Sequence, residues 1–185
     1  MGGSSHGRHP LRTATFVLIG SLAAGAGFAT LLLRGAAPGG IDDVYTRLFG
    51  PPDLGPVDFP TLRRRSSPND ALACPQDVCT ARTDVTVPDF PVDGERLRTL
   101  VKAVATADGA EHVFESSTQP QDRYVARTRL MRFPDTIDVL IVERDAGHAT
   151  LALYSRSQIG RSDLGANRAR LSRWIARLSA RTAQP

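Results

Sequence analysis

Residues 14–33 carry no charged side chain over twenty consecutive positions, and Arg12 and Arg34 stand on either side of them. At a rise of 1.5 Å per residue, a helix of this length covers about 30 Å, the hydrocarbon thickness of a bilayer. The apolar core of a cleaved signal peptide is shorter, roughly 7 to 15 residues. We therefore expect a single transmembrane helix that stays attached to the chain, with secretion after signal cleavage as the alternative.

The short leading tail and the cysteines indicate on which side of the membrane the rest of the chain lies. The tail comprises residues 1–13, and both cysteines follow the apolar segment. Short tails remain inside, and disulfides form in oxidising compartments. We expect a bacterial inner-membrane protein with a cytoplasmic N-terminus and a periplasmic C-terminal domain.

Residues 34–65 are rich in glycine and proline. This composition is typical of linkers. We expect a tether there, with one short helical turn around residues 43–48, followed by a globular domain over residues 66–185.

The net charge of +4 does not describe a uniformly basic domain. Residues 1–34 hold three arginines and no acid, and residues 161–185 hold six arginines against the single acid Asp163. The basic excess therefore belongs to the residues that flank the apolar segment and to the end of the chain. Binding to nucleic acid would require a cytoplasmic domain, so no nucleic-acid partner is expected.

Two amphipathic helices are predicted in the globular domain. Asp93 caps the first, which begins at Gly94, and Ser162 or Asp163 caps the second. We place Arg170 and the other arginines of the second helix away from its apolar stripe. Each stripe has the spacing i, i+3, i+4, i+7. The stripe residues are Leu97, Leu100, Val101 and Val104 in the first helix and Leu171, Trp174, Ile175 and Leu178 in the second.

Four runs between these helices have the composition of strands, namely 111–117, 123–133, 136–144 and 148–157, and an earlier candidate strand covers 83–87. Residues 145–147 form a tight reversal, because Gly147 can take a positive φ. The order of elements predicts an α+β fold, in which an antiparallel sheet of about four to five strands carries both helices on one face.

Cys74 and Cys79 enclose four residues in a stretch that contains proline. In an oxidising compartment a disulfide is their natural state. Two free thiols and a catalytic thiol are the alternatives. A metal site is disfavoured, because no second pair of cysteine or histidine ligands stands nearby.

Residues 154–168 are dense in arginine, serine, aspartate and asparagine. The pattern Ser-Arg-Ser-x-x-Gly-Arg-Ser-Asp-Leu-Gly-x-Asn-Arg over residues 155–168, followed by an amphipathic helix, resembles the C-terminal signature of the domain-of-unknown-function family 1499. Three earlier segments are also similar to that family: Ser67-Pro68-Asn69, the loop from Cys74 to Cys79, and Phe133-Pro134-Asp135. The resemblance spans about residues 66–178. It implies a small α+β domain, often secreted or membrane-tethered, and no particular reaction.

Guanidinium groups beside the free N–H groups of a helix N-terminus would form an anion site at this motif. In the alternative interpretation the arginines pair with Asp135, Asp138 or Asp163, and the other residues serve as caps and turns. The candidate site residues are Arg156, Ser157, Arg161, Ser162, Asp163, Asn167 and Arg168.

We expect no catalytic residue, no metal and no cofactor, because the sequence lacks a histidine cluster, a glycine-rich phosphate loop and a nucleophile elbow. The predicted function is a non-enzymatic binding or envelope-assembly module, whose partners are the membrane and an anionic ligand or lipid headgroup. The rival is an envelope hydrolase or transferase that acts on an anionic substrate through Arg156, Arg161 and Asp163.

Overall fold

The computed structural model describes residues 10–183, apart from the side chains of residues 10–20 and 146. The chain divides after residue 45 into two compact units. Each unit is described by itself.

The first unit contains the helix α1 (Pro10–Arg34) and the beginning of α2 (Ile41–Phe49). Helix α2 confirms the short helical segment expected around residues 43–48. The expected membrane span, 14–33, lies within α1, but the side chains of its residues 14–20 are outside the described part. Among the residues that are described, no helix has the length and apolar character needed to cross a bilayer.

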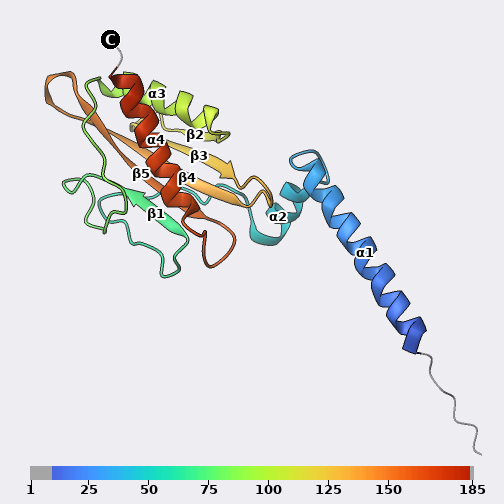
Figure 1. The fold of residues 1–185 in the computed structure, drawn as a ribbon. Helices are drawn as coiled ribbons and strands as arrows, with labels where there is room; N and C mark the ends of the chain where they lie inside the picture. The colour runs from blue at the N-terminus through green and yellow to red at the C-terminus, as the bar shows by residue number, and fades with distance from the viewer. Residues whose placement is uncertain (1–9, 184–185) are drawn as a thin grey trace, which may run out of the picture. The chain divides into compact units, whose positions relative to one another are not determined.

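The second unit is built on one five-stranded sheet (Figure 1). The strands are β1 (Asp70–Ala73), β2 (Glu111–Glu115), β3 (Gln121–Arg127), β4 (Pro134–Glu143) and β5 (Ala149–Ser157). Their order is β1-β5-β4-β3-β2, and every neighbouring pair is antiparallel. The 3₁₀ turn η1 (Asp145–Gly147) joins β4 to β5 with Gly147 at φ 74°, as its sequence predicted. The expected α+β class and antiparallel sheet are confirmed.

The first strand of the sheet is β1, and the prediction of a strand at 83–87 is wrong. Residues 83–87 contribute only a single parallel bridge, between Ala73 and Val85. Strand β1 has the sequence Asp-Ala-Leu-Ala, which has no β-branched or aromatic residue and so gave no strand signal. It is a strand because all four of its residues pair with β5.

Helices α3 (Gly94–Ala107) and α4 (Ala166–Thr182) share one apolar core with the sheet. The Asp93 carboxylate caps α3 as expected, accepting a hydrogen bond from the Arg96 N–H at 2.7 Å. Both predicted apolar stripes are buried. The core is completed by alternate residues of the strands, among them Ile137 and Leu153, which have no exposed surface.

Residues 51–65, which we name the strap, cover the opposite face of the sheet. Phe59 of the strap is buried in a second apolar cluster with Leu72 and Tyr154. The Asp53 carboxylate accepts hydrogen bonds from both Nε and Nη2 of Arg123 on β3, at 2.9 and 3.0 Å. The second half of the expected tether is therefore part of the folded domain, because its few apolar and acidic side chains find partners on the sheet.

Candidate functional site

The polar motif of residues 155–168 is divided between the two faces of the sheet. Side chains alternate along a strand, so Ser155 and Ser157 of β5 point toward the helices and Arg156 points toward the strap. Ser155 contacts Asn167 of α4, whereas Arg156 contacts the Gly55 carbonyl of the strap. The alternation of side chains along β5 thus places neighbouring residues of the motif on opposite faces of the sheet.

Asn167, which has no exposed surface, is the centre of a buried hydrogen-bond network between β5 and α4. Its Oδ1 accepts hydrogen bonds from Ser155 Oγ and from Arg170 Nη1, the latter at 2.8 Å. Its Nδ2 donates to Ser157 Oγ at 3.0 Å and to the Asn69 carbonyl at 3.2 Å. We name this network the polar lock; its members are Asn69, Asp135, Ser155, Ser157, Asn167 and Arg170.

The prediction that Arg170 lies on a solvent face of its helix is wrong. Only 6% of Arg170 is exposed, and its Nη2 donates to Asp135 Oδ2 at 2.7 Å. A buried guanidinium needs a charged partner and hydrogen-bond acceptors. Asp135, at the start of β4, supplies the charge, and Ser155 and Asn167 supply further acceptors. The sequence did not show which acid would lie opposite which arginine.

Asp163 lies just before the N-terminus of α4, where an anion site was expected. Its Oδ2 accepts from the Asn167 N–H at 2.8 Å, and its Oδ1 accepts from the Gly165 N–H at 3.0 Å. The helix itself begins at Ala166, three residues after Asp163. The chain's own carboxylate therefore takes these donors and the favourable end of the helix dipole.

Arg156 forms an ion pair with Asp138 beneath the strap, at 3.2 Å. Asp138 has no exposed surface, and its Oδ1 has no hydrogen-bond partner. Burial raises the pKa of Asp138 to about 7, although Arg156 and Arg123 lower it in part. This pair lies on the sheet face opposite to the polar lock.

The remaining candidate residues, Arg161, Ser162 and Arg168, are exposed. Ser162 Oγ accepts from the Leu164 N–H at 3.3 Å and so has a turn role. Of the seven predicted site residues, only Ser157 and Asn167 meet each other through their side chains, and their contact is structural.

A groove lined by five arginines lies beside the polar lock. It has a volume of about 540 Å³ and runs between α4 and the end of β3. Arg170, Arg173 and Arg177 come from α4, whereas Arg127 and Arg129 come from β3 and the loop after it. The spacing i, i+3, i+7 on α4 places three of them along one face of the helix. The same spacing is visible in the sequence, but the site was predicted at the motif instead.

Asp108 is the one acidic residue among the described side chains that line this arginine groove. It accepts hydrogen bonds from Trp174 Nε1 at 3.0 Å, from Arg173 at 3.2 Å and from Arg177 at 3.0 Å. Burial acts to raise the pKa of Asp108, but these donors outweigh it and hold the pKa below its usual value. Arg129 is exposed and has no acidic partner in the described part of the chain. Glu111 pairs with Arg127 and Asp135 with Arg170, so the five arginines meet three acids and the net charge of the groove is positive.

A second cluster of titratable groups comprises His112, Glu115 and Asp122, whose possible metal-ligand atoms lie within 4.8 Å of one another. Both oxygens of Asp122 already accept from Arg98, at 2.7 and 2.8 Å. Lys102 lies 3.5 Å from Glu115. A divalent cation would have to displace these two bound cationic side chains, so the donor set does not favour a metal.

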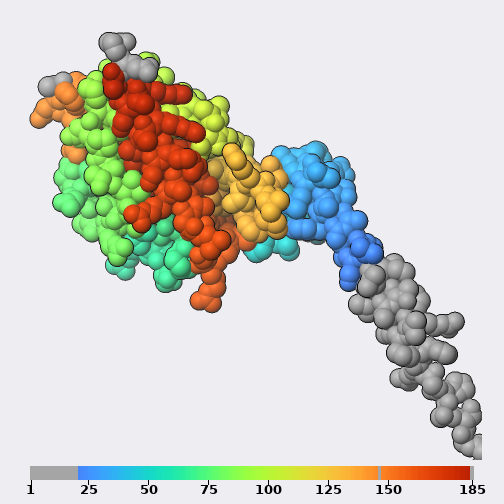
Figure 2. Space-filling view, in the orientation of Figure 1, coloured from blue at the N-terminus to red at the C-terminus, as the bar shows by residue number. Residues whose placement is uncertain are grey.

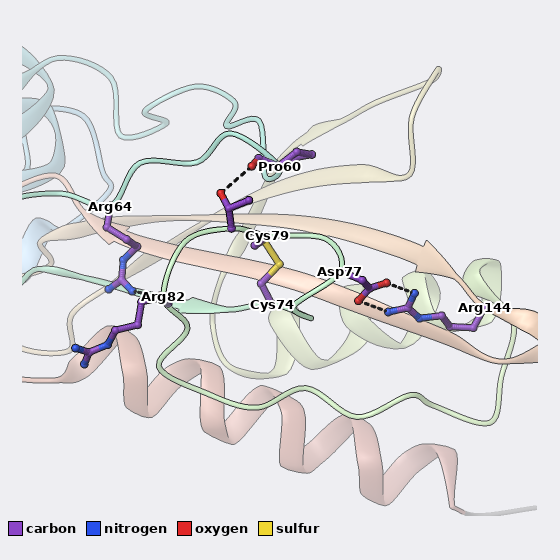
Figure 3. The surroundings of a disulfide bond; sticks show 8 residues. Pro60, Arg64, Cys74, Asp77, Cys79, Arg82 and Arg144 are labelled. Carbon is purple, nitrogen blue, oxygen red and sulfur yellow. Dashed lines mark hydrogen bonds and ion pairs between the residues drawn. A yellow bond between two sulfur atoms is a disulfide. The ribbon is translucent and has the colours of Figure 1, made fainter.

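Cys74 and Cys79 form a disulfide, as expected (Figure 3). The loop between them holds Asp77, whose carboxylate accepts two hydrogen bonds from Arg144 at the end of β4, at 2.6 and 3.0 Å. Next to the loop, Thr80 Oγ1 donates to the Pro60 carbonyl of the strap. The disulfide loop and the strap are thus held on the same face of the sheet.

Comparison with known proteins places the chain in a family. A family model described as Protein of unknown function (DUF1499) matches residues 66–178, more than half of the chain. The chain belongs to this family. The DUF1499 match includes the disulfide loop, the whole polar lock and the arginine groove. The resemblance inferred from the motif is therefore confirmed.

No curated protein matches this DUF1499 chain. Among solved structures, the protein TTHA0849 from Thermus thermophilus is similar over 61% of this chain and 90% of its own. The identity is 10% and the TM-score is 0.28.

Proposed function

We propose that this chain is a membrane-anchored, non-enzymatic binding module of the bacterial cell envelope that holds an anionic ligand in its arginine groove. The observation that carries the proposal is the composition of the groove, which is lined by five arginines and one acidic side chain, Asp108. Glu111 and Asp135 pair with two of these arginines from outside the lining, so the arginines still outnumber the acids by five to three. Guanidinium groups bind phosphate and carboxylate oxygens in a planar, bidentate manner. The ligand class is therefore a phosphate or carboxylate group small enough for a groove of about 540 Å³.

Binding is favoured over catalysis by the chemistry of the groove lining. Thr128 supplies the one side-chain hydroxyl among the described lining residues, and none of these is histidine or cysteine. A nucleophile and its general base need to lie within hydrogen-bond distance of each other. The rival hydrolase or transferase needed Arg156, Arg161 and Asp163 together. Arg156 lies under the strap, and both oxygens of Asp163 accept backbone N–H groups.

The envelope location is supported by two features of the chain. The uncharged residues 14–33 are long enough for a membrane anchor. The Cys74–Cys79 disulfide is typical of an oxidising compartment such as the periplasm.

Titration with inorganic phosphate and pyrophosphate tests the groove. The side chain of Trp174, the chain's one tryptophan, shares Asp108 with Arg173 and Arg177, so an anion that contacts those arginines should change its fluorescence. We expect Arg129→Ala and Arg173→Ala each to weaken binding about tenfold, the effect of losing one charged hydrogen bond. Arg181→Ala is the matched control, because Arg181 is an exposed arginine of the same helix outside the groove.

Two results would refute this assignment. One is an affinity equally reduced in the Arg181 control and in the groove variants, which would indicate a nonspecific effect of charge. The other is the absence of saturable binding of either anion at low salt.

A further inference from the structure

Two loops at one end of the sheet each expose a leucine. Leu130 lies between β3 and β4 and is 79% exposed, and Leu164 lies between β5 and α4 and is 97% exposed. The two loops are close together, because Thr128 and Phe133 of the first line the same small pocket as Leu164 of the second. Figure 2 shows the segment that leads into α4 projecting from the surface.

Both loops have defined backbone conformations that local hydrogen bonds maintain. Arg132 and Leu164 have φ values of 56° and 53°, and no other described residue except glycine has a positive φ. Such a conformation is unfavourable for residues other than glycine and persists only where local contacts impose it. In the first loop, the Phe133 carbonyl accepts from the Thr128 N–H at 3.0 Å, and in the second the Leu164 N–H donates to Ser162 Oγ.

The surroundings of the two leucines are positively charged. Arg129 is next to Leu130 in the chain, and Arg161 and Arg168 flank the second loop. All three are exposed, and none has an acidic partner among the described residues. The acids nearest in the chain are engaged, since Asp135 pairs with Arg170 and Asp163 accepts the N–H groups at the start of α4.

The same end of the sheet receives the chain from its N-terminal side. Gln158 follows β5 directly, and its Nε2 donates to the carbonyls of Gly50 and Pro51 at 3.2 and 2.7 Å. Leu48, just before these residues, is 68% exposed. Fewer than twenty residues separate the predicted membrane segment 14–33 from this attachment.

We propose that this end of the domain docks on an anionic phospholipid surface. Leu130 and Leu164 enter the interfacial region, and Arg129, Arg161 and Arg168 contact headgroup phosphates. Exposed apolar side chains within a basic rim are the combination that binds peripheral proteins to anionic bilayers. The inference deepens the proposed function, because it rests on the membrane anchor, which keeps the domain at high effective concentration near the lipid.

The test uses the full chain reconstituted into vesicles of phosphatidylcholine with or without phosphatidylglycerol. Both native cysteines are in the disulfide, so a Leu164→Cys variant can be labelled at one position with an environment-sensitive fluorophore. Lipids that carry a spin label near the headgroup report contact by quenching. Ser117→Cys is the matched control, because Ser117 is exposed in the loop between β2 and β3, at the opposite end of the sheet.

We expect a blue shift and quenching at position 164, but not at position 117, in vesicles that contain phosphatidylglycerol. The quenching should be lost in phosphatidylcholine alone and in a triple variant with Arg129, Arg161 and Arg168 changed to glutamine. A chain that floats with the vesicles but shows equal quenching at both positions would overturn the docking and leave the anchor intact. A chain that does not float with either vesicle would overturn the docking and the anchor together, whereas the phosphate titration of the groove is unaffected by either result.

Discussion

Replacing Asn167 with alanine tests whether the motif residues are architectural or part of a binding surface. The substitution removes both an acceptor and a donor from the centre of the polar lock. Four hydrogen bonds are lost, to Ser155, Arg170, Ser157 and the Asn69 carbonyl. Every partner residue is buried, so water cannot readily replace the missing contacts.

The expected loss of stability follows from these four bonds. A typical intramolecular hydrogen bond contributes about 1 kcal/mol net, and a buried partner left unsatisfied costs about 1–3 kcal/mol. Arg170 and Ser155 keep contacts with each other, and Arg170 keeps Asp135, which limits the damage. We expect Asn167→Ala to lower the free energy of unfolding by about 4 kcal/mol, a large share of the roughly 5–15 kcal/mol of a typical domain.

Urea denaturation followed by tryptophan fluorescence measures this change. Trp174, the one tryptophan of the chain, is fully buried against Tyr124 in the core that α4 shares with the sheet. With an m-value of about 2 kcal/mol per molar urea, the midpoint should fall by about 2 M. The control is Arg168→Ala, which changes the neighbouring, exposed motif residue and should move the midpoint by less than about 0.3 M. A loss below about 1 kcal/mol for Asn167→Ala, or an equal loss in the control, would refute the architectural assignment.

Three further predictions concern the opposite face of the sheet. Phe59→Ala should lower stability by about 3 kcal/mol, because Phe59 is buried in the strap cluster; a midpoint equal to that of the parent chain would mean that the strap is only a linker. Replacing Cys74 and Cys79 by serine should lower stability by about 2 kcal/mol through the small loop that the disulfide closes, a loss that reduced parent protein should match. Burial raises the pKa of Asp138 from 3.8 to about 7, so the folded state binds a proton that the unfolded chain has already released. The free energy of unfolding should therefore contain a contribution that falls as the pH rises from about 4 to 7. That contribution should be absent in Asp138→Asn, and identical pH profiles of the two proteins would contradict it.

The parts of the fold that the sequence predicted are those that depend on local periodicity. The stripes of α3 and α4 repeat at helical spacing, and the reversal at 145–147 joins two strands that are adjacent in the chain. In each case the information lies within fewer than about twenty residues. The disulfide was predictable for a related reason, since its two cysteines are five positions apart.

The parts that could not be predicted depend on pairing between distant residues. Strand β1 exists because it lies along β5, far later in the chain. The strap binds because Asp53 meets Arg123, which is 70 positions away. Glycine and proline content describes the backbone of residues 51–65 but does not show that Phe59 will have a pocket to fill. Local propensity carries no information on such contacts.

The candidate site shows the same division between local and distant information. The motif has an unusual composition, but composition alone does not distinguish ligand contacts from internal ones. Its buried polar residues have unusual identities because they satisfy one another inside the domain. Of the predicted site residues, Arg161, Ser162 and Arg168 remain exposed.

The polar lock and the arginine groove are joined through a single side chain. Arg170 is fixed from inside the domain by Asp135, Ser155 and Asn167, and it also lines the groove. In the proposed binding mode Arg170 is already ordered by its three internal partners, whereas the exposed Arg129 would lose conformational entropy when an anion binds. Under the proposed function, the polar lock orders one arginine of the groove before the ligand arrives. This explains in physical terms how a motif with an architectural role can lie beside a surface suited to an anionic ligand.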